Sequence, residues 1–464
     1  MLRVILKREI LHNLYSLRFF VSLALVLALF IAGSLSFVRS HEAALEKDRI
    51  ARAEFVERMK ADAANTTRLA VTRRDYPLRP RDNGFISDAK EKYLPNAISF
   101  SAWNVFSFRN KAGSINPVLV KYDELSWSLI GALVVSFITL LFTFDAVSGE
   151  KETKTLALTL SNPIPRATLF LGKYLSAVVS VLIIVGPGVL LSDFILLLSG
   201  QIGRTASLAE ETIGFLVVTA LLISTMAAFG LLGSVIARSS NISLILVLSF
   251  WLLFAAVIPN SSSFIARNLF PIDRADSVQA KINRAFDDLY KSAPAGSFTL
   301  ISGNPFIPQH ELRASLQMKL LQAEKAIRDA YSRDAFRQFE RTRFLTALSP
   351  VAVFEVMTEA VSGGGYSRFR KVWGDLHVYQ GQLLAFFKAL DAQDPKSPHW
   401  YNPYQNVSTT RNPVAFETIP QFIEKPMSFA ERIKPKIKYL VINVLYTCLV
   451  FFLSFILFVR YDVR

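Results

Sequence analysis

Residues 19–38 have the sequence FFVSLALVLALFIAGSLSFV, in which no side chain is charged. A helix needs about 20 apolar residues to cross the hydrocarbon core of a bilayer. This stretch therefore predicts a first transmembrane helix. Its apolar run is longer than the roughly 7–15 residues of a signal peptide, and no clear small-residue cleavage site follows. We expect it to be retained as a membrane anchor.

Further apolar stretches follow along the chain. They lie at residues 125–144, 174–199, 212–237, 242–259 and 439–459. The composition agrees, with 52% hydrophobic and 19% charged residues, whereas soluble domains average about 25% charged. We predict an all-α membrane protein with six transmembrane helices.

Polar segments separate these spans. Residues 1–18 carry apolar side chains at helical spacing between basic ones, which predicts an amphipathic interfacial helix, with a simple extension of the first span as the alternative. Residues 39–124 and 260–436 are long polar insertions with helical apolar spacing. We expect them to build one mainly helical extracytoplasmic domain, in which Gly363-Gly364-Gly365 is a flexible turn.

Lysine and arginine in short loops indicate the orientation, because such loops are enriched in these residues on the cytoplasmic side. Residues 145–173 carry Lys151, Lys154, Arg166 and Lys173, whereas the short loop 200–211 carries one arginine against two glutamates. We predict that both termini are cytoplasmic. Glu210 and Glu211 of that loop are expected to lie on a solvated face.

Several function classes are disfavoured. The net charge of +15 arises from basic residues spread among acidic ones, so we predict no nucleic-acid binding. Cys448 is the single cysteine, and no Cys/His cluster is present, so neither a metal nor a cofactor is expected. No nucleotide-binding glycine motif or nucleophile motif occurs, which argues against an enzyme.

The predicted cytoplasmic loop, residues 145–173, has the sequence DAVSGEKETKTLALTLSNPIPRATLFLGK. Residues 149–160 can form a short helix with Leu156 and Leu160 on one face, and the following prolines end it. A short charged helix between two spans is suited to docking into a groove on a soluble partner. An ordinary connector lying on the membrane is the alternative.

This loop resembles the signature region of ABC transporter permeases of the second exporter class, the ABC-2 type. Its matching residues are Glu150, Glu152, Thr155, Leu156, Ser161, Pro163, Arg166, Gly172 and Lys173. Lys154 departs from the family, which usually has glycine there. Residues 348–350 (Leu-Ser-Pro) and the following segment resemble the subgroup with a large extracytoplasmic domain between the fifth and sixth spans.

The resemblance implies a permease subunit of a bacterial inner (plasma) membrane without ATPase activity of its own. Its implied partners are an ABC ATP-binding subunit and a second permease subunit, identical or related; an extracytoplasmic protein is a further candidate. The residues expected to couple to the ATPase are Glu150, Glu152, Thr155, Leu156, Leu160, Ser161, Pro163, Arg166 and Lys173. A mechanotransmission complex that moves no substrate and a membrane-anchored receptor or scaffold are the alternatives.

Asp193 is the one acidic residue within a predicted span, shortly after Gly186-Pro187-Gly188, which we expect to break or kink the helix. Charged residues inside a membrane are costly and tend to be functional, so Asp193 is a candidate for a substrate path or a dimer contact. The alternative is that it lies near the outer interface and is hydrated there.

Overall fold

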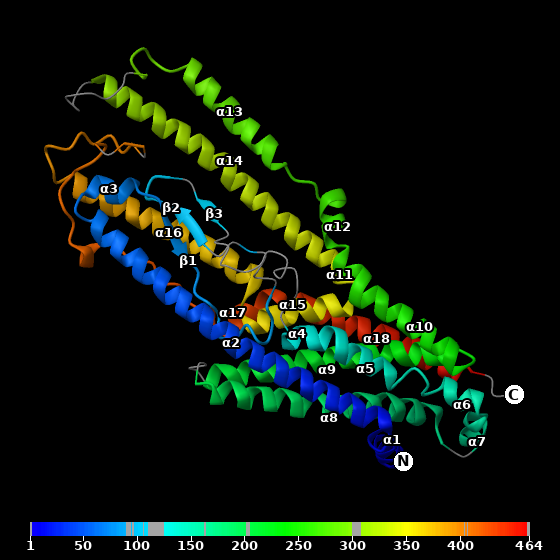
Figure 1. Cartoon of the computed structure of the whole chain (residues 1–464). Helices are drawn as coiled ribbons and strands as arrows, with labels where there is room; N and C mark the ends of the chain where they lie inside the picture. The colour runs from blue at the N-terminus through cyan, green and yellow to red at the C-terminus, as the bar shows by residue number, and fades with distance from the viewer. Residues whose placement is uncertain are drawn as a thin grey trace.

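The structure is a computed structural model, which describes residues 2–89, 94, 97–104, 106–109, 125–161, 164–200, 205–298, 308–402, 404–405 and 407–461. Long helices form a bundle, and a second group of elements extends from one end of it (Figure 1). Both termini lie at the opposite end, together with α6 and α7 (Figure 1). We call that end the terminal end and the extending part the distal domain.

The bundle consists of helices that lie side by side and bury one apolar core. Its elements are α1 (Leu2–Leu14), the first part of α2 (Leu17–Asp62), α4 (Trp127–Leu129), the π-helix η3 (Ile130–Val135), α5 (Ser136–Leu141), α8 (Arg166–Leu198), α9 (Thr205–Ile236), α10 (Ser240–Leu252), the π-helix η4 (Leu253–Val257), α11 (Ile258–Asn260) and α18 (Ile437–Val459). Helix α9 is central, because it contacts α5, α8, α10 and α18.

Five helical stretches among the described residues are long and apolar enough to cross a membrane. They are Leu17–Asp62, Arg166–Leu198, Ser207–Ile236, Ser240–Asn260 and Phe429–Val459. The chain is thus an all-α membrane protein, as its composition predicts. The predicted span 125–144 contains a shorter apolar helix, Trp127–Leu141. Its length is about 22 Å at 1.5 Å per residue, below the ~30 Å of a bilayer core.

Of the expected break or kink at Gly186-Pro187-Gly188, the break is wrong, because helix α8 continues through the triplet. Membrane helices tolerate proline when neighbouring groups compensate for the lost hydrogen bond. The glycine at 188 serves packing instead. A Cβ there would lie 2.9 Å from the Phe30 ring of α2, so the missing side chain permits the close approach of the two helices.

The distal domain is mainly helical, and it also contains a small sheet that the sequence pattern did not indicate. Its helices are the second part of α2, α3 (Thr66–Val71), α12 (Ser262–Leu269), α13 (Ala275–Lys291), α14 (Pro308–Thr346), α15 (Pro350–Ser362), α16 (Gly365–Asp391), η5 (Phe416–Thr418), α17 (Phe429–Ile433) and η6 (Lys434–Lys436). Its strands β1 (Arg74–Pro77), β2 (Ala97–Phe100) and β3 (Ser107–Arg109) pair antiparallel in the order β1-β2-β3. Strands of three or four residues are too short to show a clear alternation.

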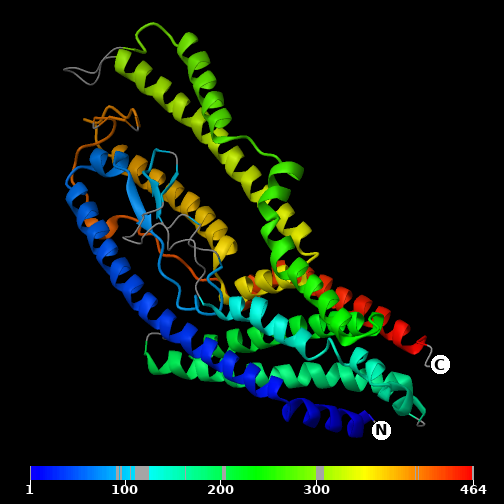
Figure 2. The same cartoon turned by 45° about the vertical axis from the view of Figure 1, so that its right-hand side comes forward.

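The core of the distal domain lies between this sheet and α16. Tyr76 of β1 stacks on Phe100 of β2 with ring centroids 4.4 Å apart, and Tyr379 of α16 meets the Tyr76 ring edge-on. Helix α2 runs from the terminal end of the bundle into this core without interruption (Figure 1). Helices α13 and α14 form a long hairpin that projects to one side (Figure 2).

The glycines 363–365 form a tightly packed turn, so the expectation of a flexible one is wrong. Gly363 (φ 70°) and Gly365 (φ 64°) adopt the left-handed conformation that glycine favours. A Cβ on Gly363 would lie 2.6 Å from Arg432 Nη1, and one on Gly365 would lie 2.8 Å from Glu359 Cδ. Both neighbours belong to ion pairs, so the turn positions charged side chains.

Candidate functional site

The signature loop forms two helices where the sequence predicted one over residues 149–160. They are α6 (Ser148–Glu152) and α7 (Thr155–Ser161), and the chain changes direction between them at Lys154. Lys154 has a φ of 60°, in the left-handed region that costs a side-chain-bearing residue about 1–2 kcal/mol. This backbone conformation explains physically why the permeases that the loop resembles usually have glycine at the position of Lys154.

Two basic side chains of the loop cap the C-terminal ends of bundle helices. Lys151 Nζ donates to the carbonyls of Val235 and Ala237 at the end of α9. Arg166 Nη1 donates to Val459 O (2.7 Å) and Tyr461 O (2.9 Å) at the end of α18. The last carbonyls of a helix lack partners within the helix and carry a partial negative charge. These two cations therefore tie the loop to α9 and α18.

Glu152 makes the complementary contact with a helix N-terminus. Its Oε2 accepts a hydrogen bond from the backbone N–H of Ser240, 3.0 Å away, where α10 begins. That bond lowers the pKa of Glu152 below its ordinary value, because it stabilises the charged carboxylate. At the start of α2, Arg18 pairs with Asp145 at 2.7 Å and donates to Leu141 O at the end of α5.

Lys173 connects the loop to α1 and α8. Its Nζ lies 2.7 Å from Glu150 Oε1 and 3.8 Å from Glu9 Oε1, and the side chain is buried. Helix α1 packs along α8: Ile5 fills the space that a side chain at Gly172 would need. Gly172 thus leaves room for α1, and Lys173 lies close to the carboxylate of Glu9 on α1.

Leu156 points into the protein and not toward the outer surface of the loop. Only 2% of its surface is exposed, and it packs in a small core with Phe170 and Phe458. Spacing identified its face of the helix but not which neighbour covers that face. The outward residues of the loop include Glu152, Thr155, Ser161 and Leu158, the last 70% exposed. Leu160 is half-buried, and Pro163 lies outside the described residues.

At the other end of the bundle, Glu211 is fully buried, so the expected solvated face is wrong for this residue. Its Oε1 lies 3.0 Å from Arg432 Nη1 and accepts a hydrogen bond of 2.7 Å from Asn83 Nδ2. Arg432 also donates to Val361 O at the end of α15. No sequence pattern indicated this cluster, because its members lie far apart in the chain.

Helix α15 is wedged between the two π-helical segments. The hydroxyls of Thr358 and Ser128 lie 2.7 Å apart, and Ser349 Oγ donates to Phe254 O of η4 at 2.6 Å. A side chain at Gly131 of η3 would collide with the Phe354 ring. π-Helical turns are frequent at functional sites. The wedge links the distal domain directly to α4–η3 and η4.

Asp193 joins α8 to α9. Its Oδ2 accepts a 2.9 Å hydrogen bond from Thr212 Oγ1. Its Oδ1 is buried and has no hydrogen-bond partner among the residues that the structure describes. The residue is half-buried overall.

Residues 3–463 match the family described as ABC-2 family transporter protein. The chain belongs to this family. The resemblance seen in the signature loop is thereby confirmed, and the protein is a multi-pass membrane permease component of an ABC transporter. Membership of this family implies an ABC ATP-binding subunit as its partner in the membrane. Comparison with curated proteins gives no match.

Proposed function

We propose that this ABC-2 permease subunit couples ATP hydrolysis by a separate subunit to export, or to movement of its distal domain, through α6 and α7. The supporting observation is the set of contacts made by the loop. Lys151 contacts the end of α9, Arg166 the end of α18, and Glu152 the start of α10. A displacement of the loop would therefore act on three bundle helices at once.

The residues of the signature divide between two roles in this proposal. Thr155, Leu158 and Ser161, which are exposed, form the contact surface for the ATP-binding subunit. Glu152 serves in both roles, because it is exposed and also accepts a hydrogen bond from Ser240. Glu150, Leu156, Leu160, Arg166 and Lys173 transmit the motion, since they face other parts of the same chain. ATP binding shifts the helix packing only if the ATP-binding subunit contacts the two arrangements of the loop differently.

Co-purification tests the contact surface. Leu158→Asp should reduce capture of the ATP-binding subunit, and stimulation of its ATPase activity, at least fivefold without lowering the amount of permease in the membrane. Val4→Asp is the matched control, because Val4 is 73% exposed at the same end of the bundle but outside the loop. Full capture and stimulation with Leu158→Asp would place the contact elsewhere.

We further propose six spans with both termini in the cytoplasm, so that the distal domain is extracytoplasmic. The apolar helix Trp127–Leu141 is the second span, extended by the turn that follows it. The loop at the terminal end carries Lys151, Lys154 and Arg166, which supports a cytoplasmic location for that end.

Cysteine labelling tests this orientation in a Cys448→Ser background. Asp287→Cys on α13 should react with a membrane-impermeant maleimide in spheroplasts, whereas Thr153→Cys should react only after permeabilisation. Both native residues are exposed, so accessibility within the fold is matched. Labelling of Thr153→Cys in intact spheroplasts would reverse the topology.

A mechanotransmission complex is the second candidate function, and the packing of α15 between η3 and η4 favours it. Motion of the second and fifth spans would pass directly into the distal domain through Thr358, Ser349 and Phe354. In that case a complex with its ATP-binding subunit and a second permease copy, reconstituted in vesicles, would hydrolyse ATP and change the distal-domain conformation without moving any substrate. Substrate transport that requires ATP would favour export.

A further inference from the structure

The short helix α12 begins two positions after the apolar span Ser240–Asn260 ends. Phe264 and Leu269 are 72% and 60% exposed on this helix, and Arg267 is exposed as well. Gln338 of α14 holds the end of α12, because its Nε2 donates to two main-chain carbonyls there, 2.7 and 3.1 Å away. A helix that exposes apolar side chains beside a basic one, next to a span, is suited to lie in the lipid interface.

Exposed side chains continue from α12 over the end of α14 to the start of α18. The Arg341 guanidinium lies 5.8 Å from the centre of the Phe270 ring, just after α12, and Lys438 Nζ lies 5.7 Å from the centre of the Phe344 ring. Arg341 and Phe344 are three positions apart on α14, so they are neighbours on one surface of that helix. Both cations are exposed, and the Phe344 ring is 50% exposed. We call Phe270, Arg341, Phe344 and Lys438 the basic strip.

The two cations of the basic strip have no carboxylate within ion-pair distance in the part of the chain that the structure describes. The carboxylates closest to the strip in sequence are engaged elsewhere. Glu340 pairs with Arg370 of α16, and Asp273 pairs with Lys281 of α13 at 2.5 Å. The strip therefore presents uncompensated positive charge to its surroundings.

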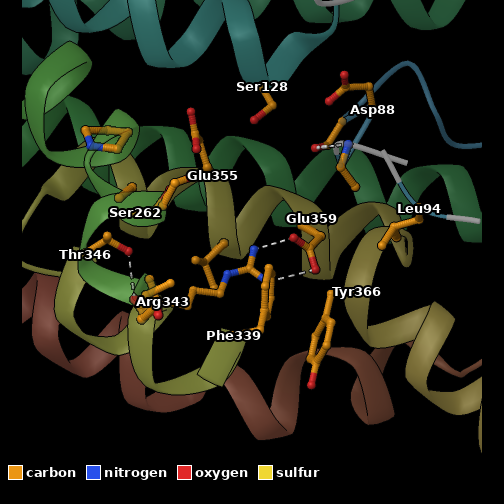
Figure 3. Close-up of a pocket in the computed structure, with 18 of the residues that line it drawn as sticks. Asp88, Leu94, Ser128, Ser262, Phe339, Arg343, Thr346, Glu355, Glu359 and Tyr366 are labelled. Carbon is orange, nitrogen blue, oxygen red and sulfur yellow. Dashed lines mark hydrogen bonds and ion pairs between the residues drawn. The ribbon is translucent and has the colours of Figure 1, made fainter. Parts of the chain in front are cut away.

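A second arginine of α14 shows the contrast with the interior of the junction. Arg343 points into the protein and makes a two-pronged ion pair with Glu359 of α15 (Figure 3). Arg341 lies two positions earlier, and residues two apart on a helix do not face the same way. The charge of Arg343 is thus neutralised within the chain, whereas that of Arg341 is directed outward.

The basic strip lies where two apolar spans end on the distal side. Lys438 is the single charged residue of α18, at its second position. A lysine at the end of a span extends its ammonium to the level of the lipid headgroups. The exposed residues of the two spans beside it are apolar, as for Ile437 (48%) and Val257 (53%). The strip therefore continues the lipid-facing surface of the spans at the level where lipid phosphates lie.

We propose that the basic strip and α12 form a docking surface for anionic phospholipids of the surrounding bilayer. Arg341 and Lys438 bind the lipid phosphate, Arg341 with its fork of donors and Lys438 as a point charge. Phe264 and Leu269 enter the acyl-chain region, so the surface selects a lipid over a soluble phosphate compound. Bound lipid fixes the base of the α13–α14 hairpin at the membrane surface. The choice of leaflet follows from the proposed topology, whereas binding itself requires neither that topology nor an ATP-binding subunit.

Native mass spectrometry of the full-length protein in detergent tests the lipid preference. Dioleoyl phosphatidylglycerol should bind at least fivefold more tightly than dioleoyl phosphatidylcholine, and glycerol 3-phosphate should not compete. The double variant Arg341→Gln/Lys438→Gln should lose most of this preference. Arg333→Gln/Lys319→Gln is the matched control, because it removes an exposed arginine and an exposed lysine of α14 that lie farther from the bundle. Unchanged thermal unfolding without added lipid identifies variants that fold normally.

Spin labelling tests whether α12 contacts lipid. In a Cys448→Ser background, a nitroxide at Phe264→Cys in phosphatidylglycerol-containing nanodiscs should be more accessible to oxygen than to a water-soluble nickel chelate. A nitroxide at Asp287→Cys on α13 should show the reverse, because Asp287 is exposed on the projecting hairpin. Both leaflets of a nanodisc have the same composition, so this measurement does not depend on the orientation in the cell.

Equal binding of the two lipids, or equal losses in the strip and control variants, would overturn the role of Arg341 and Lys438. Competition by glycerol 3-phosphate would show a site for a soluble anion instead. A label at Phe264→Cys that the nickel chelate reaches freely would place α12 in water. A label shielded from both reagents would show that protein, such as a second copy, covers this face. Each result refutes the proposal, and none bears on the coupling proposed for α6 and α7, because no ATP-binding subunit is present.

Discussion

The two ends of the bundle are held together in different ways. At the terminal end, Lys151 and Arg166 reach main-chain carbonyls at helix ends from half-buried positions. At the distal end, buried carboxylates meet arginines whose side chains are only 10–12% exposed, as in Glu211–Arg432 and Glu359–Arg343. Half-buried caps remain partly hydrated when they rearrange, whereas separating a buried pair leaves a charge in a poorly solvated site. Apart from the buried Lys173 and its carboxylate partner Glu150, the terminal end relies on contacts that rearrange more readily than those of the distal junction.

The largest expected effect is at the distal junction. Arg432→Met leaves Glu211 buried without its cation, and breaking such a pair typically costs about 3–5 kcal/mol. We expect a clear fall in the thermal unfolding midpoint in detergent. The double variant Arg432→Met/Glu211→Met should recover most of the loss, because it removes the buried charge as well. Equal losses in the single and double variants would show that the pair itself does not hold the junction.

A smaller effect is expected within α7, where two leucines two positions apart face opposite ways. Leu156→Ala should lower stability by about 2–4 kcal/mol, since it leaves a cavity in the core of the terminal end. Leu158→Ala should change stability by less than about 0.5 kcal/mol, as for other surface positions. Chemical denaturation in detergent measures both. Similar losses for the two variants would contradict the observed orientation of the helix.

The helix caps come next. Arg166→Met removes two charge-assisted hydrogen bonds to the end of α18 and should cost about 1–2 kcal/mol. Hydrogen exchange should accelerate in the last turn of α18, near Val459, and remain unchanged in α16. Arg238→Met serves as the control, because Arg238 is an exposed arginine at the same end of the bundle. Unchanged exchange in α18 would mean that Arg166 does not stabilise that helix end.

The smallest effect concerns Lys154. Lys154→Gly should raise stability by up to about 1 kcal/mol, because glycine adopts the left-handed backbone without strain. Thr153→Gly should instead lower stability by about 0.5–1 kcal/mol. Thr153 has a φ of −83°, at which glycine has no conformational advantage and loses more entropy on folding. Unfolding midpoints of the two variants should therefore shift in opposite directions. A loss in both would show that the turn is not strained by its lysine.

Much of the helical architecture follows from apolar spacing that is local in the chain. Helical spacing was predicted within residues 260–436, and α13, α14 and α16 form there. The signature loop predicted the family from a few residues, because its backbone turn and caps need particular residue types close together. The sheet was missed, since strands of three or four residues leave almost no periodic signal.

The sequence by itself determined that the chain is an apolar, helical membrane protein of the ABC-2 type. This was possible because the length of an apolar stretch and the pattern of the signature loop both depend on residues that are close together in the sequence. Only the tertiary structure decided that Leu156 faces inward, that Glu211 meets Arg432, and that α15 lies between the π-helical segments. Each of these contacts joins residues distant in the chain, and burial of a charge or an apolar face depends on which surfaces pack against it.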